Sequence, residues 1–199
     1  VRYYSTYLPL LYKLVLQQNQ IAIRDALNEK QQLLRKRARP KVLLATCYDE
    51  AIETYRRYET NIIGVISDIG FVLHKGDPSS TEKLDAGIDL CRLIRKENPT
   101  MPFLMQSSQE AMSSIAKQLK VGFVVKTSKT LTQELSAYIE REFGFGDFVA
   151  IDPRSGKEIA RASDLEAFER VISTISSAAF RRLSDNNYLS KWLFARGLF

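Results

Sequence analysis

Residues 61–71 read NIIGVISDIGF, and they determine how the middle of the chain is interpreted. The stretch starts as an apolar run, Ile62 to Ile66, and then reaches Ser67 and Asp68. A short, continuously apolar run is typical of a buried strand. Because charged side chains are excluded from buried places unless something pairs with them, a carboxylate at the end of such a strand needs a partner or a function.

Three more runs of this kind lie between Lys41 and Phe143, and each of the four is followed by a stretch with a helical pattern. The runs are residues 42–45, 62–66, 103–105 and 123–125, and the helical stretches are 50–58, 86–97, 109–119 and 131–143. Apolar strands that alternate with crossover helices indicate a parallel sheet covered on both faces. We therefore predict a doubly wound α/β domain over residues 40–143.

The first 39 residues have a different pattern. They contain no glycine, and apolar residues recur at spacings of seven and four at Leu16, Ile23, Leu27 and Leu34. This spacing predicts a long amphipathic helix over residues 1–39, which would serve as a linker or signalling helix. Its apolar stripe would pack on an upstream or downstream domain of the same polypeptide, or on an identical helix in a homodimer.

The last segment, residues 144–199, changes pattern again. Residues 147–151 and 157–160 flank a turn-rich stretch, which predicts a β-hairpin. Two helices should follow, the first with Ser163-Asp164 as its N-cap and the second with an aromatic stripe that includes Trp192. We expect this stripe to form a core.

Composition narrows the class of protein. The chain has 199 residues, of which 45% are hydrophobic, and no stretch approaches the roughly 18 apolar residues that a membrane-spanning helix needs. Its two cysteines, Cys47 and Cys91, form no CxxC motif and no cluster with His74, so neither a disulfide framework nor a zinc site is indicated. We predict a soluble, cytoplasmic protein.

The net charge is +6, and basic residues without an intervening acid gather in residues 30–41. Cations are favourable at a helix C-terminus, and Pro40 would end the helix just behind them. The alternative is that this window binds nucleic acid, although no recognition motif accompanies it.

Ligands of open α/β sheets collect at the carboxyl ends of the strands. Reading these ends in chain order places Thr46 and Cys47 after the first run, Asp68 after the second, Ser107 after the third and Lys126 after the fourth. An acid, a hydroxyl and a lysine would therefore converge at one edge. Asp68 with Lys126 could equally form a plain buried ion pair, with Ser107 capping its loop.

This constellation resembles the receiver domain of bacterial response regulators, and the resemblance implies a flavodoxin-like fold with a five-stranded parallel sheet. It also implies that Asp68 is the phosphoacceptor and that Ser107 and Lys126 contact the phosphate. Receivers hold Mg²⁺ with two acids at the positions occupied here by Thr46 and Cys47. Because a hydroxyl and a thiol are poor Mg²⁺ ligands, we expect a degenerate receiver, a pseudo-receiver.

A second departure from receivers is an insertion, residues 72–86, which reads VLHKGDPSSTEKLDA and delays the glycine of the family pattern to Gly87. Mg²⁺ could bind only if acids of the insertion supplied the missing ligands. His74, the single histidine, is expected to be an exposed loop residue of this insertion.

Longer motifs extend the resemblance over the whole chain. They read KTSKTLTQEL from residue 126, FGFGDFVAIDP from 143, GKEIARASDLEAFERVI from 156 and LSKWLFARG from 189. These resemble the N-terminal regulatory region of bacterial proteins similar to pyruvate, phosphate dikinase and phosphoenolpyruvate synthase. The resemblance implies that the catalytic domains of such a protein lie outside these residues and that this chain is not itself an enzyme.

The leading functional prediction is a non-catalytic regulatory module that controls an attached or partner phosphotransferase. One alternative is an active receiver of a phosphorelay, phosphorylated on Asp68 with Mg²⁺. A second is a nucleic-acid-binding protein that uses the basic window. Thiol redox sensing by Cys47 is a minor further option, because a lone cysteine is more often a small buried hydrophobe.

Overall fold

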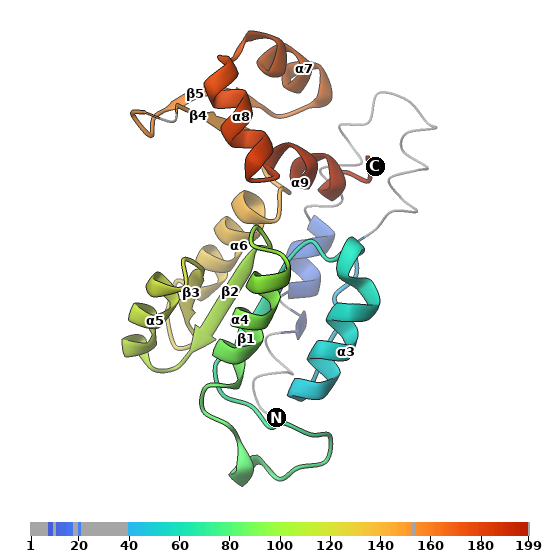
Figure 1. The fold of residues 1–199 in the computed structure, drawn as a ribbon, viewed down its shortest axis with the longest axis vertical. Helices are drawn as coiled ribbons and strands as arrows, with labels where there is room; N and C mark the ends of the chain where they lie inside the picture. The colour runs from blue at the N-terminus through green and yellow to red at the C-terminus, as the bar shows by residue number, and fades with distance from the viewer. Residues whose placement is uncertain (1–7, 10, 18–19, 21–39, 153, 199) are drawn as a thin grey trace. The chain divides into compact units, whose positions relative to one another are not determined.

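The computed structural model describes residues 8–9, 11–17, 20, 40–152 and 154–198. The chain forms two compact units (Figure 1). The first unit is Val42–Leu135, and the second joins Ser136–Phe199 with the start of the chain up to Lys41.

Helices and strands alternate in the first unit. In chain order they are α3 (Tyr48–Tyr58), the 3-10 turn η1 (Glu59–Asn61), β1 (Val65–Asp68), η2 (Ser79–Thr81), α4 (Ala86–Glu97), β2 (Phe103–Ser107), η3 (Glu110–Met112), α5 (Ser113–Gln118) and β3 (Gly122–Val125). The next helix, α6 (Leu131–Glu142), begins in the first unit and continues into the second. The predicted helix over residues 86–97 has the bounds of α4. The predicted strands over 62–66, 103–105 and 123–125 correspond to β1, β2 and β3 with shifted ends.

The sheet of this unit is parallel and has the order β1-β2-β3. Its register places Val65 opposite Phe103 and Leu104 opposite Gly122. Successive side chains of a strand point to opposite faces. Because Phe103, Leu104 and Met105 of the central strand are all at most 1% exposed, both faces of the sheet are covered at β2.

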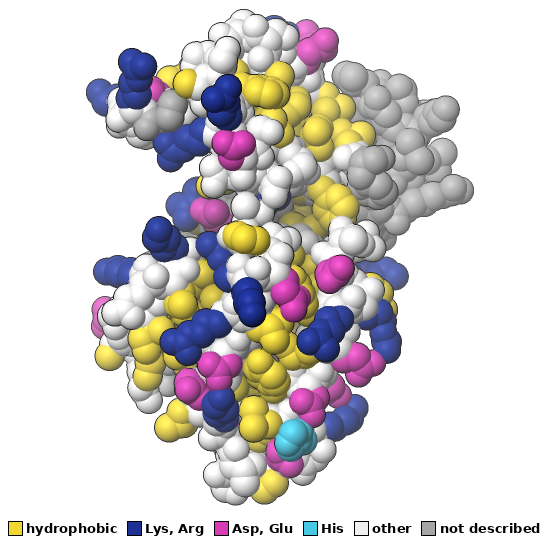
Figure 2. Space-filling view, viewed as in Figure 1, with side chains coloured by type: hydrophobic (Ala, Val, Ile, Leu, Met, Phe, Trp, Pro, Cys, Tyr) yellow, Lys and Arg dark blue, Asp and Glu magenta, His cyan; other side chains and the backbone are white. Residues whose placement is uncertain are grey.

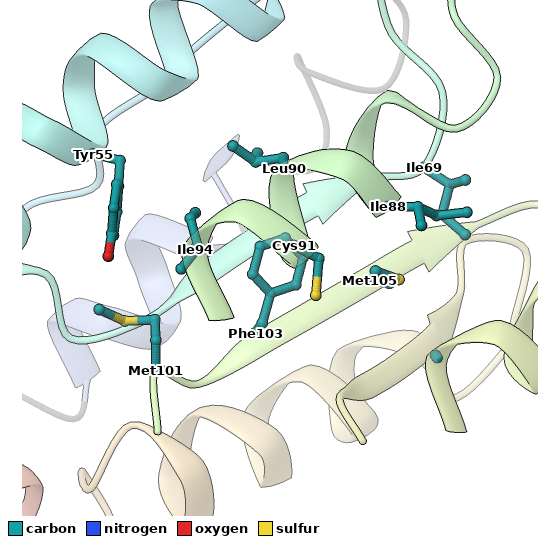
Figure 3. Close-up of a cluster of buried hydrophobic side chains, with 10 residues drawn as sticks. Tyr55, Ile69, Ile88, Leu90, Cys91, Ile94, Met101, Phe103 and Met105 are labelled. Atoms are coloured by element: carbon teal, nitrogen blue, oxygen red, sulfur yellow. The ribbon is translucent and has the colours of Figure 1, made fainter. Parts of the chain in front are cut away.

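The main core of the first unit lies where α3 and α4 meet β2 (Figure 3). Tyr55 comes from α3, while Ile88, Leu90, Cys91 and Ile94 come from α4, and the two helices are in contact. They belong to one buried cluster with Phe103 and Met105 of β2, and Figure 3 shows Cys91 beside Phe103. The apolar spacing along α4 thus explains why this helix covers the sheet.

The prediction of a five-stranded parallel sheet is wrong. Among the described residues the parallel sheet has three strands, and the only other sheet is the separate antiparallel pair β4–β5. The run Val42 to Ala45, which was expected to be a strand, is irregular. Its Leu43 and Leu44 are 50% and 49% exposed.

Two physical reasons account for the missing strands. An apolar run of four residues carries the local signal of a buried strand, but a strand forms only where it finds a hydrogen-bonding neighbour, which local sequence does not specify. In addition, α3 is followed by β1 after only residues 59–64. A further parallel strand with its crossover needs about a dozen residues or more, so there is no room for one here.

The second unit contains the predicted hairpin. β4 (Phe148–Ile151) pairs antiparallel with β5 (Glu158–Ala162), with a register shift between Ala150 and Ile151. Asp164 caps α7 (Leu165–Thr174), since its carboxylate accepts a hydrogen bond from the Ala167 amide at 2.7 Å. This confirms the predicted N-cap.

Two further helices follow where the sequence predicted one. They are α8 (Ser177–Asp185) and α9 (Tyr188–Ala195), and Asn187 separates them with a φ of 57°. Asparagine is among the few residues that enter this left-handed region readily, so it ends the helical run. Trp192 of α9 is 2% exposed and packs with Phe148 and Phe168, so this part of the aromatic stripe forms a core, whereas Phe180 and Tyr188 of the same stripe are each 41% exposed.

Residues 8–9, 11–17 and 20 at the start of the chain are helical. Leu11 and Leu14 are buried there, whereas Leu16 of the predicted stripe is 49% exposed. The rest of the stripe, at Ile23, Leu27 and Leu34, lies outside the described residues, as does the basic window up to residue 39.

Candidate functional site at the carboxyl edge of the parallel sheet

The carboxyl ends of β1, β2 and β3 bring the predicted residues to one edge of the sheet. Asp68 is the last residue of β1, Ser107 is the last residue of β2, and Lys126 directly follows β3. The amide of Lys126 donates to the carbonyl oxygen of Ser107 at 2.9 Å, which extends the pairing of β2 with β3 up to the lysine. Parallel pairing therefore places the three residues as the sequence predicted.

Asp68 and Lys126 form an ion pair at this edge. The distance from Lys126 Nζ to Asp68 Oδ2 is 2.7 Å, and the two side chains are only 15% and 25% exposed, the lysine being the less exposed. Ion pairs shielded from water in this way are screened less than pairs on the open surface. Lys126 thus neutralises the carboxylate at the end of β1.

The second carboxylate oxygen of Asp68 has no such partner among the described residues. Asp68 Oδ1 is buried and accepts no hydrogen bond from any described residue, and the same holds for Oε1 of Gln106. Asp68 and Gln106 are opposite each other in the β1–β2 register, so their side chains leave the same face of the sheet. Buried acceptors without a donor from the protein itself are uncommon, and such acceptors are often met by water or an ion.

The backbone around Asp68 is tightly constrained. The amide of Gly87, at the start of α4, donates to the carbonyl oxygen of Ile69 at 2.8 Å. A Cβ atom at Gly87 would lie 2.0 Å from the carbonyl oxygen of Asp68, so only glycine fits. Ser67, 7% exposed, donates its hydroxyl to the same Asp68 carbonyl at 2.8 Å. Although the insertion places Gly87 later in the sequence than the corresponding glycine of receivers, Gly87 thus lies against the end of β1.

Ser107 caps its own loop in this structure. Its Oγ accepts a hydrogen bond from the amide of Gln109 at 3.1 Å. The backbone pairing places Ser107 beside Lys126, and its hydroxyl serves the turn that leads to η3.

Thr46 and Cys47, where receivers carry their acidic pair, have other contacts. The amide and the hydroxyl of Thr46 both donate to Glu50 Oε2, at 2.9 and 2.7 Å. Cys47 is 2% exposed at the start of α3, which is the environment of a small buried hydrophobe. The structure therefore uses these two positions to begin α3.

Glu50 is the most strongly perturbed carboxylate near this edge. Its pKa is lowered to about 2 by the hydrogen-bonded Lys75 and then by the two donors of Thr46. Lys75 Nζ lies 2.7 Å from Glu50 Oε1. Because Lys75 belongs to the insertion, this pair connects the insertion to α3.

The sequence indicated Asp68, Ser107, Lys126 and Gly87, but it did not indicate Gln106 or Glu50. Gln106 stands one position before Ser107 and has no motif of its own, and its relation to Asp68 depends on the β1–β2 register. Glu50 had only the weak signal of an acid in the first turn of a helix.

No group of three or more histidine, cysteine, aspartate or glutamate side chains within the described part of the chain is arranged to hold a metal ion. Nor does any helix described here have the length and apolar character needed to cross a bilayer. No protein-family model, curated protein or solved structure matches the chain.

Proposed function

We propose that the chain is a non-catalytic regulatory module and that its switch element is the carboxyl edge of the parallel sheet at Asp68. In this view it is a degenerate receiver, similar to receivers in Asp68, Ser107 and Lys126 but without their acidic pair. It would control a phosphotransferase that is attached to it or that binds it as a partner. The observation that carries the proposal is the Asp68–Lys126 ion pair of 2.7 Å at the strand ends.

The electrostatics of the edge favour regulation over catalysis. Lys126 already neutralises Asp68, and Thr46 and Cys47 supply no carboxylate beside it. Phosphoryl transfer to a carboxylate depends on a bound cation that neutralises the charge developing on the phosphoryl oxygens. A paired Asp68 is better suited to hold one of two states of the edge than to attack a phosphodonor.

The proposal is tested by comparing the wild-type chain with Asp68→Asn. Both proteins are incubated with acetyl phosphate and Mg²⁺, and intact mass is measured. We expect no mass gain in either. In parallel, amide NMR spectra of the two proteins should differ at Gln106, Ser107, Lys126 and Thr127, because losing the charge of Asp68 releases Lys126 from the edge.

Two results would contradict the proposal. A mass gain of one phosphate in the wild type that is lost in Asp68→Asn would establish an active receiver. Unchanged amide signals around Ser107 and Lys126 in the variant would show that Asp68 does not control the conformation of the edge.

A further inference from the structure

The insertion is bound to the N-terminus of α3 by its backbone. The amides of Tyr48 and Asp49 donate to the carbonyl oxygens of Val72 and Leu73 at 3.0 and 3.1 Å. These are the first two residues of α3, whose amides have no partner within the helix. The insertion therefore supplies the backbone acceptors for the N-terminus of α3.

Two ion pairs reinforce this contact. His74 Nδ1 lies 2.7 Å from Asp49 Oδ2, and Lys75 Nζ lies 2.7 Å from Glu50 Oε1. Neighbouring residues of the insertion thus pair with neighbouring acids in the first turn of α3. His74 is also held from within the insertion, since its amide donates to Asp77 Oδ2 at 3.1 Å.

The two pairs respond differently to pH. The Lys75–Glu50 pair keeps its charges near neutral pH, because the pKa of Lys75 is raised and that of Glu50 is lowered by their mutual hydrogen bond. The His74–Asp49 pair is ionic only while the imidazole is protonated. Its histidine is the single one of the chain, and it lies on the surface among acidic and basic side chains (cyan in Figure 2).

The acidic groups around His74 favour its protonated form. Asp49 of α3 and Asp77 of the insertion both raise the pKa of His74, the hydrogen bond from Asp49 being the largest cause. Lys75 is the nearby cation, but Glu50 neutralises it, with Glu53 and Cys47 as its further electrostatic neighbours. His74 therefore gains protonation when the insertion is docked.

From these contacts we infer that the insertion is a pH-sensitive latch, in which protonated His74 fastens residues 72–75 to the N-terminus of α3 and deprotonation loosens them. The sign follows from linkage. A group whose pKa is raised in the docked state stabilises docking fully below its ordinary pKa, and this stabilisation is lost as the pH rises through the raised pKa. The latch is fastened in mildly acidic solution and loosened in alkaline solution, while the Lys75–Glu50 pair holds in both.

The titration of His74 gives the first half of the test. Because the chain has one histidine, the imidazole Cε1–H signal in an NMR titration of the full chain belongs to His74. We expect a midpoint above the ordinary value of 6.5 in the wild type and a lower midpoint in Asp49→Asn, where only Asp77 still raises it. Equal midpoints in the two proteins would overturn the latch.

Amide hydrogen exchange gives the second half. Protection factors of the Tyr48 and Asp49 amides, corrected for intrinsic exchange rates, should fall about two- to fivefold between about pH 5.5 and about pH 8.5, the range expected for exposed ion pairs. The fall should match the factor given by the measured shift in the His74 midpoint. The Val65 amide, which donates to Pro102 in the sheet, is the internal reference.

Matched variants separate the latch from other effects. In His74→Gln the protection of the Tyr48 and Asp49 amides should no longer depend on pH, whereas Lys75→Gln should lower it at every pH and keep the dependence. Both side chains are mostly exposed, so folding should be retained, and far-UV circular dichroism checks this. A shifted titration with constant protection of Tyr48 and Asp49 would show a surface ion pair that fastens nothing, and would refute the latch.

Discussion

Each of the two units contains a charged side chain that is largely shielded from water. The two side chains differ in how fully their hydrogen-bonding groups are satisfied. In the second unit, Arg196 is 7% exposed and donates to the carbonyl oxygens of Gly144, Gly146 and Trp192. Its guanidinium also lies 3.6 Å from the centre of the Trp192 ring. In the first unit, Asp68 has one oxygen paired with Lys126, while its other oxygen accepts nothing from the described residues.

This difference separates a structural group from a candidate functional one. A buried charge is tolerated where its hydrogen-bonding capacity is met, and the Arg196 guanidinium is provided with backbone acceptors and an aromatic face. A buried acceptor left without a donor carries a cost that a purely structural role does not repay. The unsatisfied oxygen of Asp68 thus adds to the Asp68–Lys126 ion pair as support for the proposed switch at this edge.

The largest expected effect tests the structural role of the buried aromatic cluster in the second unit. Trp192→Ala should destabilise the second unit by about 3–5 kcal/mol, because it removes a ring that is 2% exposed and packs on Phe148, Phe168 and Arg196. Urea unfolding followed by circular dichroism measures the change in free energy.

The matched control is Trp192→Phe, which keeps an aromatic ring but loses the 3.0 Å hydrogen bond from Nε1 to the Gly146 carbonyl. It should cost clearly less than the alanine variant. If Trp192→Ala cost under about 1 kcal/mol, a value typical of surface positions, the aromatic cluster would not be what stabilises this unit.

A smaller effect is expected at the backbone of the candidate site. Gly87→Ala should destabilise the first unit by about 1–3 kcal/mol, because the new methyl group would lie 2.0 Å from the Asp68 carbonyl oxygen and force β1 and α4 apart. Urea unfolding gives the stability, and the amide NMR signals of Ser67, Asp68 and Ile69 should shift.

Gly70→Ala is the control for Gly87→Ala, since its nearest atom would be Leu84 Cα at an ordinary 3.5 Å. It should change stability little. Equal costs at the two glycines would mean that the close approach of α4 to the end of β1 is not maintained in solution.

Elements of the fold could be predicted where the residues that determine them lie close together in the sequence. The bounds of α4, the hairpin and the Asp164 cap come from periodicity, turn residues and a capping side chain within a few positions, and the structure confirms them. The run Val42 to Ala45 had an equally good local pattern, but it is irregular because a strand also requires a distant partner.

The same limit applies to the candidate site. The edge formed by Asp68, Ser107 and Lys126 could be predicted because parallel strands end at one side of their sheet. The unpartnered oxygen of Gln106 and the contact of the insertion with α3 could not, because they depend on strand register and on residues about 25 positions apart, as for His74 and Asp49.

The smallest expected effect tests the unsatisfied side-chain oxygen of Gln106, opposite Asp68 in the first unit. Gln106→Met replaces a half-buried side chain, whose buried Oε1 receives no hydrogen bond from the described residues, by an apolar side chain of similar length. We expect the free energy of unfolding to stay within about 0.5 kcal/mol of the wild type or to rise by up to about 1 kcal/mol, because removing an unsatisfied buried polar group is neutral or favourable. Arg196→Met, which removes the hydrogen bonds from the guanidinium to the carbonyl oxygens of Gly144, Gly146 and Trp192, should instead be clearly destabilising. If Gln106→Met were as destabilising as Arg196→Met, Gln106 would have a hydrogen-bond partner in solution, and the contrast between the two units would not extend to Gln106.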